Sequence, residues 1–582
     1  MRPTGRIVTS PEICLDSSSK SDMRWFALLG AIAASVLLVT SLGYGLTLQG
    51  FALGRPTSVP QRGGTVQALD DVPISLLPAN AGTLNPVAVL SLPETDGAAN
   101  PGAGDQHSPH GKGHATGPID ATLPSGPAQY RAGIGWSGIS GANSSCFQPI
   151  IGMSGSPLAC LPPDVTMSAS PHYVVEEDNT AGIIWTNTGH FVKRFTLTNF
   201  YTVPSGAGCY LSDPQVYFDN GTQRWFSSIL SVTCGALNTQ QPDVSSQIYL
   251  GVSQTSDPSA AWFEYVIPNP LPLNLSDQPF LGMNDHVVVI STNQFPFSAL
   301  AINTYTGAYF WVLDKLALEQ DGCTNPGGLF CSVDYQAFGP YSDLASIHPA
   351  HSYGPAPTEY MASLLPVNPG QTGVSTLNFF RVEGTPPSAS VVMTNLTVRP
   401  TEGPPLGNQP GMDQSVNTDD SRISTGVYQG GVSWWGANDG CTVAGESGVH
   451  DCIRLIQIGA KQGKFQVRQD FDFNSGNNED DYYPGITLDP SGDLAVTYAF
   501  SSPTEYPSVA ISLQSASQPG ALQTPTTVAV GTDTEQGGRY GDFCDASPSY
   551  GNPSELWFAC EYIINYNDYV WNTRVQQMFV TG

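Results

Sequence analysis

A short apolar run, a tight turn and a second apolar run recur along most of this sequence, and this unit limits the fold more than any other feature. The unit is clearest in residues 212–230, where the runs 216–218 and 225–230 flank the pair Asn220-Gly221. An Asn-Gly pair between two such runs is the strongest short-range signal of a β-hairpin. Repetition of the unit predicts small antiparallel sheets arranged radially.

Seven clusters of predicted strands follow one another after residue 170. They cover residues 172–197, 214–267, 278–318, 347–398, 422–473, 482–531 and 540–580. Their spacing leaves room for one four-stranded blade with its loops in each cluster, and no long pattern of helical period interrupts them. We therefore expect an all-β fold, a β-propeller with seven blades, with six or eight as alternatives. A two-sheet sandwich repeated twice is the rival architecture.

The charge composition excludes one class of partner. Charged residues make up 12% of the 582 residues, about half the usual share of roughly 25%, and the formal net charge is −28. Nucleic-acid binding depends on basic side chains that displace counterions from phosphates, and only 21 Lys and Arg are present. We expect no nucleic-acid partner. The low charge would also suit acidic surroundings, where carboxylates are protonated and self-repulsion falls.

The N-terminal region predicts export. Residues 25–48 contain no charged side chain, which is long enough for a helix that crosses a hydrocarbon core of about 30 Å. Basic residues are more frequent before this segment than after it, so residues 1–24 are expected to be a cytoplasmic tail and the C-terminal part to be extracellular. This predicts a transmembrane signal-anchor and a single-pass protein of the cell membrane. A cleaved signal peptide and a secreted protein form the alternative.

A segment rich in Gly, Pro, Ala and Ser follows the apolar stretch. Residues 49–129 show no sustained period, although the short apolar runs 72–77 and 87–92 could pair locally. Such a composition is typical of a flexible linker. The sequence therefore predicts a tethered ectodomain at residues 130–582.

The cysteines indicate an oxidising compartment. Ten of the eleven lie after the apolar segment and fall into five neighbouring pairs: Cys146 and Cys160, Cys209 and Cys234, Cys323 and Cys331, Cys441 and Cys452, and Cys544 and Cys560. These separations suit disulfides that staple hairpins or loops. The zinc alternative lacks any CxxC spacing. Neighbour pairing is the simplest connectivity, although sequence alone does not determine it.

Six ordered phrases carry a family resemblance. They lie at residues 212–226, 253–265, 277–295, 420–435, 482–508 and 539–562. They resemble secreted, sialidase-like β-propeller proteins of microbes, most of them functionally uncharacterised, over roughly residues 170–575. Residues 255–262 are also similar to the Asp-box turn of sialidase-type propellers, with Ser259 where Gly is usual. The resemblance implies a scaffold, and a fold alone does not assign a function.

The resemblance also suggests candidate site residues. Sialidases use three arginines for the substrate carboxylate and a Tyr/Glu pair as nucleophile. The corresponding candidates are Glu505, Tyr506 and Asp542 for catalysis and Arg422, Arg539 and Asp277 for substrate binding. A third arginine has no candidate. Arg–Asp pairs between blades are the structural alternative, because they satisfy buried polar groups.

One stretch has the spacing of a calcium loop. Asp470, Asp472, Asn474 and Asp481 occupy positions 1, 3, 5 and 12 of such a loop. Gly476 comes one place late for the usual sharp turn, so a loop without metal is the favoured alternative. Calcium is the only cofactor that the sequence suggests.

These observations predict an extracellular, membrane-tethered β-propeller that binds a glycan or another surface protein. The alternatives are a sialidase-like glycoside hydrolase and a structural protein of the cell envelope. Binding is favoured over catalysis, because the arginine triad is incomplete and no nucleophile elbow is present.

Overall fold

The computed structural model describes residues 74–76, 80–84, 88–91, 128–141, 162–203, 210–232, 246–269, 271–296, 305–320, 332–367, 370–373, 375–411, 415–535, 540–565 and 570–581. All of them belong to one compact unit, Ala52–Gly582. Strands dominate these ranges, which contain only two short helices, α2 (Leu197–Phe200) and α3 (Lys315–Glu319). The all-β prediction is confirmed.

The strands form six sheets. Three contain four strands each: β5 (Thr166–Ala169), β6 (Tyr173–Glu177), β7 (Ala181–Thr186) and β8 (Phe191–Thr196); β26 (Asp480–Leu488), β27 (Leu494–Ser502), β28 (Glu505–Gln514) and β29 (Thr526–Ala529); and β30 (Asp545–Pro548), β31 (Glu555–Asn565), β32 (Val570–Thr581) and β4 (Gln129–Ser140).

Two sheets contain a four-stranded run with a fifth strand added at its outer edge. They comprise β9 (Tyr210–Asp219), β10 (Arg224–Val232), β11 (Ser246–Ser253), β12 (Ala261–Ile267) and the added β3 (Ala88–Ser91); and β17 (His348–Pro349), β19 (Thr358–Leu364), β20 (Thr376–Glu383), β21 (Ser390–Thr397) and the added β1 (Ile74–Leu76).

The sixth sheet has ten strands and contains two antiparallel runs. They are β13 (Asn274–Met283), β14 (Val287–Pro296), β15 (Gly307–Asp314) and β16 (Val333–Tyr341), extended by β2 (Asn80–Leu84); and β22 (Ile423–Gln429), β23 (Val432–Cys441), β24 (His450–Lys461) and β25 (Lys464–Phe473). The short β18 (His351–Ser352) joins the two runs through parallel pairs to β13 and β22. Division at β18 therefore gives two four-stranded units.

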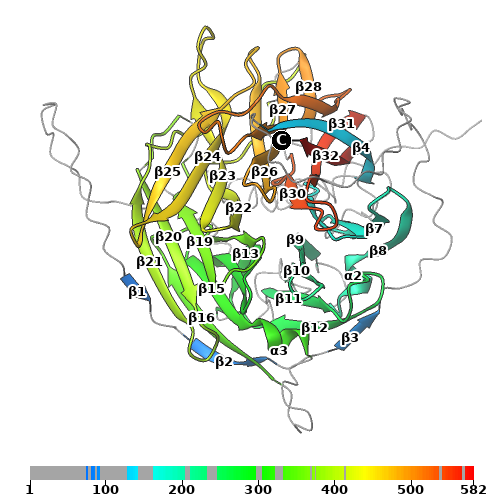
Figure 1. Ribbon diagram of the computed structural model, residues 1–582, viewed down its shortest axis with the longest axis vertical. Coiled ribbons are helices and arrows are strands. Elements are labelled where there is room, and N and C mark those ends of the chain that lie inside the picture. Colours follow the sequence, from blue (N-terminus) through cyan, green and yellow to red (C-terminus); the bar gives the residue numbers. More distant parts are fainter. Residues whose placement is uncertain are drawn as a thin grey trace, which may run out of the picture. The chain divides into compact units, whose positions relative to one another are not determined.

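The first strands of the four-stranded units lie against one another in a closed cycle. β5 contacts β9, β9 contacts β13, and the contacts continue through β17, β22, β26 and β30 back to β5. Figure 1 shows the later strands of each unit extending outward from these first strands. Radial sheets around a closed cycle of first strands define a β-propeller. The propeller prediction is confirmed, and the sandwich alternative is wrong.

The hairpin that the sequence marked most clearly forms as expected. β9 and β10 pair antiparallel up to Asp219 and Arg224, so residues 220–223 make the turn. The Asp219 carboxylate accepts hydrogen bonds from the N–H groups of Gly221 (3.2 Å) and Thr222 (3.1 Å). An Asp that caps its own turn in this way fixes the register of the two strands.

The predicted Asp-box turn also has its expected geometry. The Asp257 carboxylate accepts a hydrogen bond from the Ser259 N–H (2.9 Å), and the buried Trp262 indole donates to the Pro258 carbonyl (2.9 Å). The first bond holds the turn itself, and the second ties the turn to the start of β12. The box therefore acts as a folding device here.

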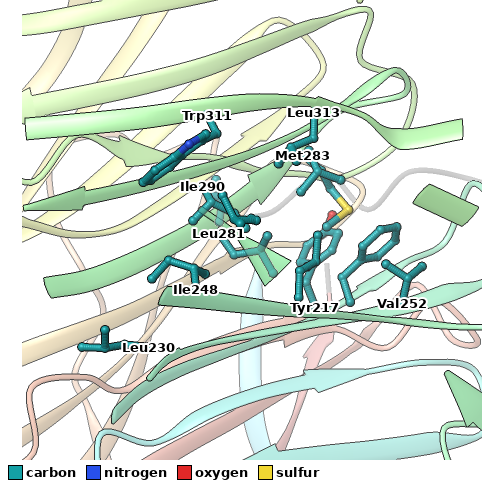
Figure 2. Packing of buried hydrophobic residues seen from close by; sticks show 14 of the residues in the cluster. Tyr217, Leu230, Ile248, Val252, Leu281, Met283, Ile290, Trp311 and Leu313 are labelled. Atoms are coloured by element: carbon teal, nitrogen blue, oxygen red, sulfur yellow. The ribbon is translucent and has the colours of Figure 1, made fainter. Parts of the chain in front are cut away.

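The core lies between neighbouring sheets. Figure 2 shows Tyr217, Leu230 and Ile248 from one sheet facing Leu281 and Trp311 from the next. These side chains belong to one cluster of buried residues that continues into later units. Burial of such apolar surface from facing sheets is the main force that holds a propeller together.

Residues 74–91 fall within the predicted linker, yet they form three paired strands. β3 pairs with β12, β2 with β16 and β1 with β21, all antiparallel. Figure 1 shows these three strands, in blue, along the outer edges of successive units. The local pairing suggested for the runs 72–77 and 87–92 is thus replaced by pairing with strands far away in the sequence.

Other N-terminal predictions lie outside the described residues. The predicted tail at 1–24 and the transmembrane segment at 25–48 both fall there. Among the helices that the structure describes, none has the length and apolar character needed to cross a bilayer.

Two of the five predicted disulfides are present. Cys441 bonds to Cys452, and Cys544 bonds to Cys560. The six cysteines of the other three predicted pairs lie outside the described residues: Cys146, Cys160, Cys209, Cys234, Cys323 and Cys331.

Two leucines, one just before β13 and one near its end, provide a matched test of the core. Leu281 is fully buried, whereas Leu273 is 64% exposed. Leu281→Ala should lower the free energy of unfolding by about 2–5 kcal/mol, because it removes buried apolar contacts and leaves a cavity. Leu273→Ala should change it by less than about 0.5 kcal/mol. Urea unfolding of both variants measures the difference, and equal effects would contradict this assignment of the core.

Candidate functional site

The backbone has unusual φ angles where the chain enters most of the first strands. Eleven non-glycine residues in the described ranges have positive φ. Six of them lie at or just before the first strands of six successive units, and we call them the entrance residues: Asp164, Asp213, Gln278, Ser346, Asp419 and Tyr483. Positive φ in a residue other than Gly, Asn or Asp is uncommon, and for a bulky residue such as Tyr483 (φ 55°) it is a clear outlier.

At three of these positions the left-handed residue forms part of a β-bulge. Asp213, Gln278 and Tyr483 are each followed by proline, and the strand register shifts at each of these positions. A bulge redirects the side chains beside it and interrupts the ladder. The same local device therefore recurs in β9, β13 and β26.

Hydrogen bonds connect the entrance residues across units. Asp164 accepts from the Asp542 N–H (3.1 Å) and from the Asn179 side chain (2.6 Å). The side-chain oxygen of Asn179 in turn accepts a hydrogen bond from the Asp213 N–H (2.6 Å). The Asp213 carboxylate accepts one from the Gln278 N–H (3.0 Å). One continuous chain of hydrogen bonds thus links the last unit, the first unit and the next two.

Arg422 extends this chain from β22 to β13. Its guanidinium donates to both oxygens of Asp420 (2.8 and 2.5 Å) and to the Gln278 side chain (2.7 Å), and it lies 2.8 Å from the Asp419 carboxylate. The side chain is 5% exposed. Arg422 was predicted to bind a substrate carboxylate. The guanidinium of Arg422 already binds two carboxylates of its own chain, Asp419 and Asp420. This is the structural alternative of an Arg–Asp pair that the sequence also suggested.

The other predicted binding and catalytic residues lie in two places. Asp542 is buried beside Asp164, and the half-buried Asp277 precedes Gln278 in the bulge of β13. Glu505 instead lies at the turn between β27 and β28, where its side chain is exposed, and Tyr506 follows it as a half-buried residue. Arg539 is outside the described residues.

Glu505 is paired with another carboxyl group. Burial and the neighbouring Glu505, with which it shares a hydrogen bond, raise the pKa of Glu479 above its usual range.

A buried histidine lies beside two other carboxyl groups. The His450 ring nitrogens are 3.4 Å from Glu446 and 3.6 Å from Asp480, and neither nitrogen has a hydrogen-bond partner among the described residues. The residue is only 6% exposed. The Cys441–Cys452 disulfide ties together the strands on either side of the loop that carries Glu446.

The residues of the predicted calcium loop have other partners. Asp470 accepts two hydrogen bonds from the buried Arg454, and Asp472 accepts two from Arg399, both 2.6 Å. Asp481 accepts hydrogen bonds from Ser475. The Asn474 amide donates to backbone carbonyls of its own loop and of β24.

The calcium interpretation therefore lacks its first two ligands, because both carboxylates neutralise arginines. Among the residues that the structure describes, no group of three or more His, Cys, Asp or Glu side chains is arranged to hold a metal ion.

The sequence did not predict most of the side chains that connect the entrance residues of different units. Gln278 and Asn179 are uncharged, so no charge pattern in the sequence identifies their contacts across units. The repeated pair of a polar residue and proline at residues 213–214 and 278–279 was a usable signal. It marks two of the three bulges.

A separate set of acidic residues is buried in the first unit. Burial raises the pKa of Glu176 and of Glu177 to about 8 and that of Asp178 to about 6. Glu176 accepts a hydrogen bond from Thr573, and Glu177 accepts one from Ser227 (2.8 Å). These carboxyl groups link neighbouring units and favour the protonated form.

No protein-family model matches the chain, and no curated protein matches it. Among solved structures, a Trypanosoma rangeli sialidase in complex with 2,3-difluorosialic acid is similar at 8% identity and a TM-score of 0.32, over 70% of this chain and 59% of the sialidase. A Hadza microbial sialidase matches at 8% identity and 0.31, over 69% and 75% of the two chains.

A Dyadobacter fermentans protein of unknown function matches at 9% identity and 0.26, over 65% of this chain and 97% of its own. Sialidases and other β-propellers are thus among the similar structures, in line with the resemblance found in the sequence. Likeness at this level carries no argument about activity.

The buried carboxyl groups of β6 predict a pH dependence. A carboxyl whose folded pKa is raised stabilises the fold fully below its unfolded value, and this stabilisation is lost as pH rises through the folded pKa. For Glu176 and Glu177 the window runs from 4.5 to about 8. The free energy of unfolding should therefore fall as pH rises over this window, because each raised pKa contributes on the order of 1.4 kcal/mol per pKa unit.

The double variant Glu176→Gln/Glu177→Gln keeps the shape of both side chains and removes their titration. It should flatten the profile over this window and be more stable than the unaltered protein at the alkaline end. Urea unfolding at stepped pH measures both effects. An unchanged slope in the double variant would contradict the assignment.

The arginine partners of Asp470 and Asp472 predict no stabilisation by calcium. Excess calcium or a chelator should change Tm by less than about 1 °C, whereas saturation of a folded-state site at 100 times Kd would add about 2.7 kcal/mol. Thermal unfolding with and without calcium measures the effect. A rise in Tm that Asp472→Asn abolishes would restore the calcium interpretation.

Proposed function

We propose that this chain is an exported, seven-bladed β-propeller that binds a glycan at the entrance residues. The observation that carries the proposal is the set of six left-handed residues at the first strands, Asp164, Asp213, Gln278, Ser346, Asp419 and Tyr483. Hydrogen bonds and the Arg422 ion pair join four of them, Asp164, Asp213, Gln278 and Asp419. Each such residue costs on the order of 1–3 kcal/mol, and strain of this kind concentrates at ligand sites. The closed cycle of seven first strands supports the proposal of seven blades.

The chemistry of the entrances suits a ligand with many hydroxyl groups. Carboxylates act only as acceptors, and amide side chains supply both donors and acceptors. Asp164, Asp213 and Asp542 lie within one chain of hydrogen bonds together with Asn179 and Gln278. Side chains fixed in this way lose little freedom when a sugar binds, so the cost of ordering the site is low.

The arrangement favours binding over hydrolysis. A sialic acid carboxylate would have to displace Asp419 and Asp420 from Arg422. The carboxyl group of Glu505 neighbours that of Glu479 and raises its pKa. A glycoside hydrolase that uses Glu505 is therefore the second candidate, and the experiment below separates the two.

Export is supported by the disulfides. Cys441–Cys452 and Cys544–Cys560 connect neighbouring strands or loops of the propeller. Such bonds persist in oxidising compartments. We further propose that residues 25–48 anchor the chain in the membrane with the propeller on the outside, as the distribution of basic residues around this segment indicates.

A glycan array followed by titration of the best oligosaccharide tests the function. Asp542→Asn should weaken binding by about tenfold or more, which corresponds to 1.4 kcal/mol, because it replaces a charged acceptor at the entrances. The matched control is Asp489→Asn, which alters a buried acid at the other end of the strand β26. It should leave the affinity unchanged.

Equal loss of affinity in both variants, or no binding across the array, would contradict the proposed site. The same oligosaccharides offered as fluorogenic glycosides should show no turnover. Turnover that Glu505→Gln abolishes would establish the hydrolase instead.

A further inference from the structure

The outermost strands of the seven four-stranded units fall into two groups. β12, β16 and β21 are covered by β3, β2 and β1, whereas β8, β25, β29 and β4 form the outer edges of their sheets. We call residues 74–91 the belt, because its three strands follow one another along three neighbouring units (Figure 1).

The two groups differ in charge. The covered strands read AWFEYVI, VDYQAFGPY and SVVMTNLT and contain no Lys or Arg. Among the uncovered strands, β8 carries Lys193 and Arg194, β25 carries Lys464 and Arg468, and β4 carries Arg131. The remaining uncovered strand, β29, has only four residues.

This difference has a known physical meaning. An outer strand presents free N–H and C=O groups that can pair with another chain, and cationic side chains or a short length prevent such pairing. The uncovered strands have these protections, and the covered strands lack them. The amino-acid sequence of each outer strand thus agrees with whether a strand of the belt covers it.

We propose that the belt prevents self-association, and that its displacement turns β12, β16 and β21 into a surface that pairs with the same strands of a second copy of this chain. The partner is another copy because two such edges offer each other unpaired backbone groups and carry no Lys or Arg that would block the pairing. The belt's own pairing with these edges demonstrates that each accepts an antiparallel strand.

The test uses the full chain with proline pairs in the belt. Adjacent residues of a strand direct their N–H groups to opposite sides, so two neighbouring prolines must remove one donor to the covered edge. The variant carries proline at Gly82 and Thr83 in β2 and at Val89 and Leu90 in β3. The matched control carries a proline pair at Ala98 and Ala99, which belong to none of the described strands.

Hydrogen exchange should become faster in β12 and β16 of the belt variant. Its mass by light scattering should rise with concentration by about twofold or more, as a symmetric dimer requires. Circular dichroism checks that the fold persists. The control should stay monomeric.

A rescue variant separates edge pairing from misfolding. Ala261→Lys and Asp334→Lys place cations on β12 and β16, and Asn395→Lys places one on β21. Added to the proline variant, they should restore the monomer, which they would not do for an unfolded aggregate. A monomeric proline variant with fast exchange in β12 and β16 would overturn the proposal. Unchanged exchange there would also overturn it, because the belt would then not cover these edges.

Discussion

The antiparallel ladder between β4 and β32 is the interaction on which the rest of the propeller depends. It pairs residues 129–140 with residues 572–581 and completes the last sheet with a strand from the N-terminal side of the chain. Without β4, the last sheet would end at β32 with three strands, and the apolar cluster that includes Val580 would lose the cover of Tyr130. Closure of the cycle also fixes the positions of the seven first strands.

The chemistry of the molecule follows from that closed cycle. First strands that meet at one centre bring acidic side chains from distant parts of the sequence together, as Asp164 and Asp542 illustrate. With only 21 basic residues in the chain, amides and backbone N–H groups have to satisfy most of these carboxylates. Arg422 and Arg454 are exceptions, and each holds two or more aspartates in a buried network. Such networks favour specificity of structure over net stability.

The sequence predicted features that depend on neighbouring residues. The hairpin at Asn220, the turn at Asp257 and the disulfides Cys441–Cys452 and Cys544–Cys560 are local, so composition and spacing were enough. The sequence did not predict the contacts between different units. Arg422 was recognised as important, yet its partner Gln278 is 144 residues away and carries no motif. Glu505 was placed with Arg422 because both lie near strand ends, but the turn between β27 and β28 directs Glu505 toward Glu479.

The pairing of β4 with β32 has a consequence for how the molecule is made. Chains emerge from the ribosome N-terminus first, so the strand that completes the last sheet is synthesised long before its neighbour. The same holds for β1, β2 and β3, whose neighbours β21, β16 and β12 come much later. Contacts so distant along the chain form slowly, because a long loop must first close. An exported nascent chain would thus spend its translocation time with four unpaired strands at its leading end.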